Sequence, residues 1–364
     1  MNRNASTALP MLGFTSAVTL LLAFPASATV QAPETTATET AATETAAMET
    51  PSAEVPPESP LARRDRERLE MLAAAGLERS VLETAAGRLV YWQGGEGPPL
   101  VLLHGSGDSA GTWAMTAREL VGERRLLIPD LPGHGASDPA EGVLPFATIV
   151  AGLEALLDAA QLEEPVLAGN SMGAWLAMLY AHKHPGRVSR VVAINGGAIL
   201  GEPSDVKLMP ADREEARQAM AGIRDPSSPP IPDEVLDEIV ARASSGPIRR
   251  MMMDLGGMMA YLLDGKLGEI STPMDLLWGE SDQLMKLSYA EKMAAALPRA
   301  RITRIPKCGH IPQSECPERF VGLLRQVLAL DPPEAAEAEA PTAVTEPLAE
   351  AAGGAPATVG TGRR

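Results

Sequence analysis

The chain has 364 residues and a formal net charge of −16, and much of this acidity lies in two flanks. Residues 1–60 hold 6 acidic and 1 basic residue, and residues 331–364 hold 6 acidic and 2 basic residues. The body at 61–330 keeps 35 acidic and 28 basic residues, a net charge of −7. Because nucleic-acid binding needs a basic face, this balance argues against a nucleic-acid partner. The length of the body suits one domain with an insertion.

The first 28 residues have the pattern of an export signal. Arg3 gives a short positive start, and an apolar stretch follows that is densest from Val18 to Phe24. The small residues at 26–28, Ala-Ser-Ala, then form a cleavage pattern. The alternative is an uncleaved membrane anchor, but the apolar run is short for a span of ~20 residues. We therefore expect a periplasmic or secreted protein without a stable membrane span after signal cleavage.

Two segments are poor in large apolar side chains. Residues 29–60 consist mainly of Ala, Thr, Glu and Pro, and residues 331–364 have the same character. Such segments cannot bury enough apolar surface to offset the entropy lost on ordering the chain. The composition predicts a disordered linker at 29–60, a folded domain at 61–330 and a disordered acidic tail at 331–364.

The first part of the body alternates between strand and helix patterns. It opens with an amphipathic helical pattern at 61–75 that ends at Gly76. The run at 99–103, Pro-Leu-Val-Leu-Leu, is continuously apolar, which is typical of a strand buried on both faces of a parallel sheet. The other elements expected here are strands at 81–84, 88–93, 125–129, 166–168 and 188–194, and helices at 112–121, 146–160 and 173–184.

Residues 198–270 interrupt this alternation. They contain helical patterns separated by Pro-rich turns, and no clear strand pattern. We interpret them as a helical lid inserted between two strands. Five methionines in this stretch fit either the wall of an apolar pocket or ordinary lid packing, namely Met251, Met252, Met253, Met258 and Met259. Alternation then resumes with strands at 274–278 and 301–305 and helices at 286–297 and 317–330. The order predicts an α/β fold with a parallel sheet covered on both faces.

A nucleophile motif follows the strand at 166–168. Gly169-Asn170-Ser171-Met172-Gly173 fits G-x-S-x-G, and a helical pattern follows it. A sharp turn from strand to helix lifts the serine hydroxyl above the sheet and leaves no room for a side chain at the glycines. The alternative is a tight turn without chemistry. The strand and helix on either side favour Ser171 as a nucleophile.

A serine hydroxyl needs a base to accept its proton. Of the five histidines, His310 lies in a loop after the last strand, and such loops lie at the same sheet edge as Ser171. Asp282 follows the strand at 274–278 and is the expected acid that orients His310, with Glu280 as the competing carboxylate. The remaining histidines are expected in structural or surface roles, namely His104, His134, His182 and His184.

Acyl transfer also needs donors for a developing oxyanion. One expected donor is the backbone N–H of Met172, the residue after the nucleophile. The second is the backbone N–H of Ser106, in the loop His104-Gly105-Ser106-Gly107 that follows the apolar strand at 99–103.

The motifs together resemble the α/β-hydrolase superfamily over about residues 81–330. They include the segments at 104–107, 130–137, 169–173, 279–282 and 308–310, in the order that is usual for the family. The resemblance implies a mostly parallel eight-stranded sheet with a lid after the sixth strand, and no metal or organic cofactor. It also implies that the catalytic residues are Ser171, Asp282 and His310.

The motifs resemble two kinds of α/β hydrolase. Gly-Asn-Ser-Met-Gly is similar to bacterial esterases and lipases and also to carbon–carbon hydrolases of ring-fission diketones. The latter typically carry aromatic residues after the catalytic histidine, whereas Ile311 and Pro312 follow His310 here. These carbon–carbon hydrolases also act inside the cell, whereas this chain has the pattern of an export signal. The sequence therefore favours a small-molecule ester with an apolar acyl group as substrate, with carbon–carbon hydrolysis and a non-catalytic binding module as alternatives.

The two cysteines, Cys308 and Cys316, flank His310. An exported protein could pair them, but their spacing does not show that the side chains converge. The sequence alone therefore does not decide whether the two cysteines form a disulfide. Two cysteines and one histidine fall short of a four-ligand metal site.

Overall fold

The computed structural model describes residues 58–331 and 333. The predicted export signal at 1–28, almost all of the linker at 29–60 and almost all of the tail at 331–364 lie outside these residues. The described residues belong to a compact unit that begins at Pro57. Within them, no helix combines the length and the apolar character that crossing a bilayer requires.

The first helix, α1 (Pro60–Ala74), begins inside the predicted linker. Pro60 occupies the start of the helix, where its missing N–H has no intrahelical partner to lose. Ser59 is the N-cap, and its hydroxyl accepts the N–H of Ala62 at 3.3 Å. The helix therefore begins one residue before the expected start at residue 61.

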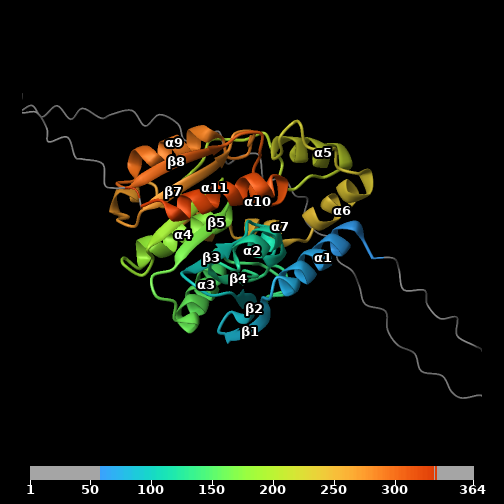
Figure 1. The fold of residues 1–364 in the computed structure, drawn as a ribbon. Helices are drawn as coiled ribbons and strands as arrows, with labels where there is room; N and C mark the ends of the chain where they lie inside the picture. The colour runs from blue at the N-terminus through green and yellow to red at the C-terminus, as the bar shows by residue number, and fades with distance from the viewer. Residues whose placement is uncertain (1–57, 332, 334–364) are drawn as a thin grey trace, which may run out of the picture. The chain divides into compact units, whose positions relative to one another are not determined.

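An eight-stranded sheet forms the centre of the molecule, in the order β1-β2-β4-β3-β5-β6-β7-β8 (Figure 1). Strand β2 pairs antiparallel with β1 and β4, and the other neighbouring strands pair parallel. This confirms the predicted α/β class and the mostly parallel sheet. The strands are β1 (Glu78–Thr84), β2 (Gly87–Gly94), β3 (Pro99–Leu103), β4 (Arg125–Pro129), β5 (Val166–Asn170), β6 (Arg190–Ile194), β7 (Met274–Gly279) and β8 (Ala300–Ile305).

Helices cover both faces of the sheet, which explains the apolar strands. In β3, Val101 and Leu103 join one core cluster, while Leu100 and Leu102 join the other. One face packs against α3 (Phe146–Ala160), α4 (Met172–Lys183) and α9 (Leu287–Ala296). The opposite face packs against α1, α2 (Ala114–Leu120) and α11 (Pro317–Ala329). Burying each large apolar side chain contributes roughly 1.5–3 kcal/mol.

The chain between β6 and β7 is helical, as its pattern predicts, and the structure places no strand between residues 194 and 274. It contains α5 (Arg213–Gly222), α6 (Asp233–Ala243), α7 (Pro247–Met252), α8 (Leu255–Met259) and the 3-10 turn η2 (Leu267–Glu269). Helix α5 packs on α6, and α6 contacts α1 (Figure 1). Glu238 of α6 accepts hydrogen bonds from the hydroxyl of Ser59 and the N–H of Leu61. We call residues 198–270 the inserted segment. That this segment moves as a lid stays a prediction.

Element boundaries differ from the predicted ones where residues outside the apolar run still pair. Strand β1 begins at Glu78 because the polar residues before Val81 continue its pairing with β2 at the edge of the sheet. Strand β5 continues to Asn170, because Gly169 and Asn170 pair with β6. The expected helix at 112–121 is a 3-10 turn, η1 (Ala110–Trp113), followed by α2.

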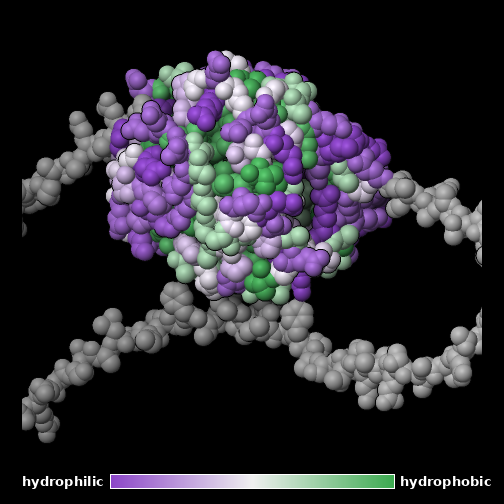
Figure 2. Space-filling model, turned by 90° about the horizontal axis from the view of Figure 1, so that it is seen from below, coloured by the Kyte–Doolittle hydropathy of each residue, from purple (hydrophilic) through white to green (hydrophobic). Residues whose placement is uncertain are grey.

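The surface is mainly hydrophilic on the face seen in Figure 2, with hydrophobic residues in small patches between polar ones. This fits a body whose polar and charged side chains are solvated on this face.

Candidate active site

Ser171 lies in a strained turn between β5 and α4. Its φ of 53° and ψ of −114° fall in a region that L-residues rarely adopt, and such strain costs roughly 1–3 kcal/mol. The turn is tight: a Cβ added to Gly169 would lie 2.2 Å from the carbonyl of Gly173, and one added to Gly173 would lie 2.2 Å from the Leu103 oxygen. The glycines of the motif are therefore required by close backbone packing.

His310 and Asp282 form a buried pair. The Nδ1 atom of His310 lies 2.7 Å from Oδ2 of Asp282, and the residues are 5% and 2% exposed. A carboxylate only accepts hydrogen bonds, so in the neutral ring the proton resides on Nδ1. Nε2 then carries a lone pair and can accept a proton. Glu280, the competing carboxylate, is exposed and makes no hydrogen bond to His310.

Hydrogen bonds fix both oxygens of Asp282. Oδ1 accepts the N–H groups of Leu284 and Met285, at 2.8 and 2.9 Å. Oδ2 accepts the amide of Asn195 at 2.8 Å in addition to His310. The other end of Asn195 accepts the N–H of Gly279 at 2.9 Å. Asn195 was not among the predicted site residues, although it directly follows the buried strand β6 at the same sheet edge.

The side chain of Asn170 joins the serine turn to the histidine loop. Its amide nitrogen donates to the carbonyl of His310 at 2.8 Å and to the carbonyl of Ile194 at 3.1 Å. Its oxygen accepts the amide of Gln313 at 3.1 Å. Asn170 directly precedes Ser171, so this contact brings the two loops together. The structure thus places Ser171, Asp282 and His310 on loops that converge at the carboxyl edge of the sheet.

The loop at 104–107 lies beside Ser171. A Cβ on Gly105 would be 3.2 Å from Cβ of Ser171. His104 is fully buried; its Nδ1 bonds to the carbonyl of Gly105 at 2.8 Å, and its Nε2 accepts the N–H of Leu131 at 2.9 Å. The Gly105 carbonyl and the Ser106 N–H belong to one planar peptide unit and point in opposite directions. His104 therefore fixes the direction of the Ser106 N–H, a role that fits its expected structural assignment.

The two expected oxyanion donors are free of internal acceptors. Among the described residues, neither the N–H of Ser106 nor that of Met172 donates to another backbone or side-chain atom. Met172 opens α4, and the first N–H groups of a helix have no intrahelical partner. Both groups can therefore bind a ligand oxygen.

The remaining histidines lie outside this arrangement. His134 is buried next to His104 and bonds to the carbonyl of Pro132 at 3.0 Å. Burial lowers the pKa of His134 to about 3, so it is neutral at physiological pH. His182 and His184 lie at the end of α4, near carboxylates of Glu269 and Glu154.

The cysteines flanking His310 form a disulfide, Cys308–Cys316, which answers the question that their spacing left open. The bridge closes the segment that carries His310 and the short helix α10 (Pro312–Glu315), which the sequence did not predict. It therefore restrains the histidine loop covalently.

The inserted segment borders the site. Ile248 of α7 lies against Gly107, because a Cβ on that glycine would be 3.1 Å from the Ile248 side chain. Of the five methionines, Met251 and Met258 are buried, whereas Met253 and Met259 are 63% and 39% exposed. The buried pair belongs to the core cluster and fits ordinary packing.

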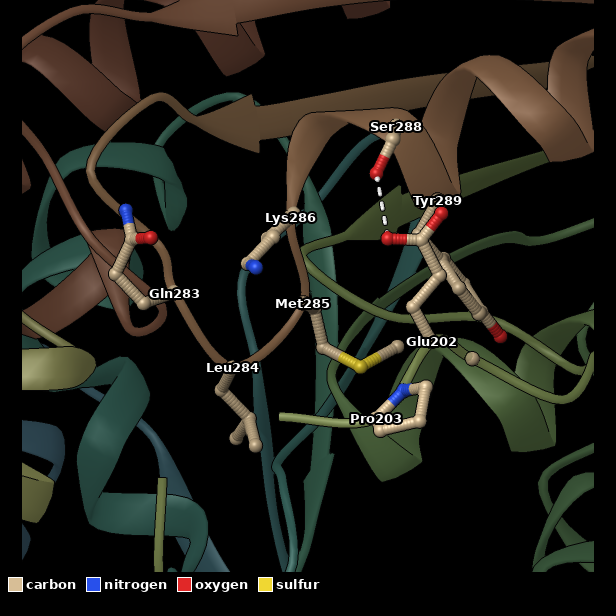
Figure 3. Close-up of a pocket in the computed structure, with 9 residues that line it drawn as sticks. Glu202, Pro203, Gln283, Leu284, Met285, Lys286, Ser288 and Tyr289 are labelled. Atoms are coloured by element: carbon tan, nitrogen blue, oxygen red, sulfur yellow. Dashed lines mark hydrogen bonds between the residues drawn. The ribbon is translucent and has the colours of Figure 1, made fainter. Parts of the chain in front are cut away.

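Two hollows lie away from Ser171. A cavity of about 10 Å³, room for about one water molecule, lies between Glu202 and Pro203 on one side and the loop after Asp282 on the other (Figure 3). A shallow groove of about 560 Å³ runs beside α1, with Trp92 and Arg242 in its wall. Ser171 lines neither hollow.

Comparisons with known proteins agree with this arrangement. The chain is 30% identical to the pimeloyl-(acyl-carrier protein) methyl ester esterase of Aromatoleum aromaticum, over 64% of this chain and 98% of the relative. It is 31% identical to a 2-hydroxy-6-oxononadienedioate/2-hydroxy-6-oxononatrienedioate hydrolase of Paraburkholderia phymatum, over 63% and 86%. A solved membrane phospholipase A, described as a bacterial virulence factor, superposes with a TM-score of 0.64 at 26% identity, over 74% of this chain and 91% of that one.

The match at family level covers most of the residues that the structure describes. Residues 100–323 match the sequence profile described as the alpha/beta hydrolase family. This range begins in β3 and ends in α11, and it includes all three loops that converge at the site. The chain belongs to the alpha/beta hydrolase family.

Proposed function

We propose that the protein hydrolyses a carboxylic ester through an acyl-enzyme intermediate on Ser171. The observation that supports this most directly is the buried pair of Asp282 and His310, on a loop tied by Asn170 to the serine turn. The pair sets the tautomer of the imidazole, and the tie joins the backbone of the histidine loop to the turn that carries the strained serine.

In the proposed reaction, Oγ of Ser171 attacks the ester carbonyl carbon while Nε2 of His310 accepts the hydroxyl proton. The carbonyl oxygen becomes an oxyanion that accepts hydrogen bonds from the N–H groups of Met172 and Ser106. The C–O bond to the alcohol then breaks, and His310 donates its proton to the leaving alcohol. Water attacks the acyl-enzyme with His310 again as base, which releases the acid and restores Ser171.

An apolar acyl group fits the surroundings of the oxyanion loop. Ile248 lies against Gly107, next to the expected donor Ser106, so an apolar side chain borders the position where the substrate carbonyl would bind. This contact favours an alkyl or aryl acyl chain over a charged one.

Carbon–carbon hydrolysis of a ring-fission diketone is the second candidate. Its support is the relative at 31% identity whose name records that kind of substrate. Both reactions begin at a carbonyl carbon, so the same three residues could serve either. Ile311 after His310 favours the ester, because carbon–carbon hydrolases resembling this chain typically carry an aromatic residue there.

The test is turnover of p-nitrophenyl esters of graded acyl length. We expect saturable hydrolysis with an optimum chain length, loss of turnover in Ser171→Ala, and labelling of Ser171 by a fluorophosphonate. Turnover of a ring-fission dienone with poor turnover of every ester would favour the second candidate. Folded protein that neither turns over an ester nor reacts with the fluorophosphonate would refute the ester proposal and support a binding module.

We also propose that the protein is exported. The support is the signal pattern at residues 1–28 together with the Cys308–Cys316 disulfide, since such bonds persist in oxidising compartments. Expression in a bacterial host should yield a periplasmic or secreted protein whose N-terminus is Thr29. A cytoplasmic protein that retains Arg3 would contradict the proposal.

A further inference from the structure

Two successive N–H groups of the histidine loop connect it to the inserted segment, one directly and one through Glu315. The N–H of His310 donates to the carbonyl of Ile223 at 2.8 Å, directly after α5. The N–H of the preceding residue, Gly309, donates to Oε2 of Glu315 at 2.6 Å. Because these groups flank the Cα atom of Gly309, their partners restrain the backbone that leads into His310.

The second oxygen of Glu315 binds the inserted segment. Oε1 accepts the N–H of Asp225 at 2.7 Å and the hydroxyl of Ser228 at 2.5 Å. A single carboxylate therefore bridges two parts of the chain: one oxygen holds the histidine loop, and the other holds the turn after α5. Hydrogen bonds to a charged acceptor are about twice as strong as neutral ones.

The packing at this junction leaves no free space. A Cβ on Gly309 would lie 2.2 Å from the carbonyl oxygen of Ile223 and 2.7 Å from Cα of Arg224. The loop carrying Asp282 meets the same turn, because the N–H of Gln283 donates to the carbonyl of Gly222 at 2.9 Å. The turn at residues 222–225 thus contacts the acid loop and the histidine loop together.

We propose that Glu315 is a positioning residue, which sets the direction of the His310 imidazole by clamping the histidine loop onto the turn at residues 222–225. It acts through the backbone and does not touch the reacting atoms. The inference rests on the proposed ester hydrolysis. Displacing a catalytic group by about 1 Å can reduce turnover about a hundredfold, so a loosened clamp should reduce kcat more than it alters KM.

Glu315→Gln tests the clamp selectively. An amide has one accepting oxygen, which we expect to stay with the two donors of Asp225 and Ser228. The NH2 group then faces the N–H of Gly309, and the arm to the histidine loop is lost. We expect kcat to fall about tenfold in Glu315→Gln and about thirtyfold or more in Glu315→Ala, with KM within about twofold of the wild type.

Glu318→Gln is the matched control. Glu318 lies in the first turn of α11, is exposed, and accepts no hydrogen bond from another described residue. The same chemical change there should leave kcat unchanged.

Rates should be normalised to the number of sites labelled by a fluorophosphonate at completion. This separates positioning from loss of folded protein, because a purely structural role would reduce the number of labelled sites and leave the rate per site intact. A kcat per site in Glu315→Gln and Glu315→Ala equal to that of Glu318→Gln would overturn the inference. Absence of wild-type ester turnover would instead refute the proposed function.

Discussion

Replacing Asp282 by asparagine keeps the shape of the side chain and converts one oxygen into an NH2 group. The hydrogen-bond partners of the two oxygens decide which of the two positions the NH2 group takes. Oδ1 accepts two backbone N–H groups, from Leu284 and Met285, so an NH2 group there would face two donors. We therefore expect the amide oxygen at the Oδ1 position and the NH2 group at the Oδ2 position, facing His310 and Asn195.

This orientation forces the wrong tautomer on His310. An NH2 group donates, so Nδ1 of the imidazole must accept, and the ring proton moves to Nε2. Asn195 cannot rescue the geometry by rotating its amide, because its oxygen accepts the N–H of Gly279. With Nε2 protonated, His310 has no lone pair for the proton of Ser171.

The expected loss of kcat for Asp282→Asn is about 10³- to 10⁴-fold, the size seen when a catalytic triad loses its carboxylate. At 1.36 kcal/mol for each factor of ten, this raises the barrier by about 4–5.5 kcal/mol. Steady-state hydrolysis of the best p-nitrophenyl ester measures it, with Glu280→Gln as the control at the neighbouring carboxylate. If Asp282→Asn keeps more than a tenth of wild-type kcat while Glu280→Gln loses most of it, the assignment of the acid is wrong.

Three further predictions concern stability. Arg250 donates to four backbone carbonyls of the loop at 133–142, so Arg250→Met should lower the free energy of unfolding by roughly 3 kcal/mol in urea titrations. Reducing the Cys308–Cys316 disulfide should lower it by about 2.5 kcal/mol, from the loop entropy of a segment this short. An unchanged midpoint of urea unfolding in the presence of reductant would contradict this prediction. Burial lowers the pKa of His134 to about 3, so below about pH 6.5 the unfolded chain binds a proton that the folded protein excludes. Stability is then full above that pH and falls as the pH decreases toward 3, by roughly 2 kcal/mol at pH 5; His134→Asn should flatten this dependence.

The central strands of the sheet could be predicted because they are short and apolar on both faces. The run at 99–103 has this pattern, and its side chains divide between the two core clusters. Strand β1 was harder to delimit, because an edge strand exposes every second residue and Glu78 has no apolar signal. Pairing with β2, which only the tertiary structure supplies, extends it.

Ser171, Asp282 and His310 could be selected because each follows a strand of the parallel part of the sheet, and those strand ends share one edge. The same rule points to Asn195, which follows β6, although nothing in its neighbourhood in the sequence indicates that it binds Asp282. Glu315 does not follow a strand, and no sequence pattern indicated a role for it in the site. Its partner Asp225 lies 90 residues away in the chain, so their contact depends on how the inserted segment folds back.

The contacts of the inserted segment argue against movement of the whole segment as a lid. Its turn at 222–225 holds the histidine and acid loops, while Arg250 of α7 holds the loop at 133–142. Swinging the segment away would leave buried donors and acceptors unpaired at both anchors, at roughly 1–3 kcal/mol for each group. It would also release His310 just when substrate enters. We therefore expect substrate to enter through local movement near Ile248, whose contact with Gly107 is apolar, while the two hydrogen-bonded anchors stay closed.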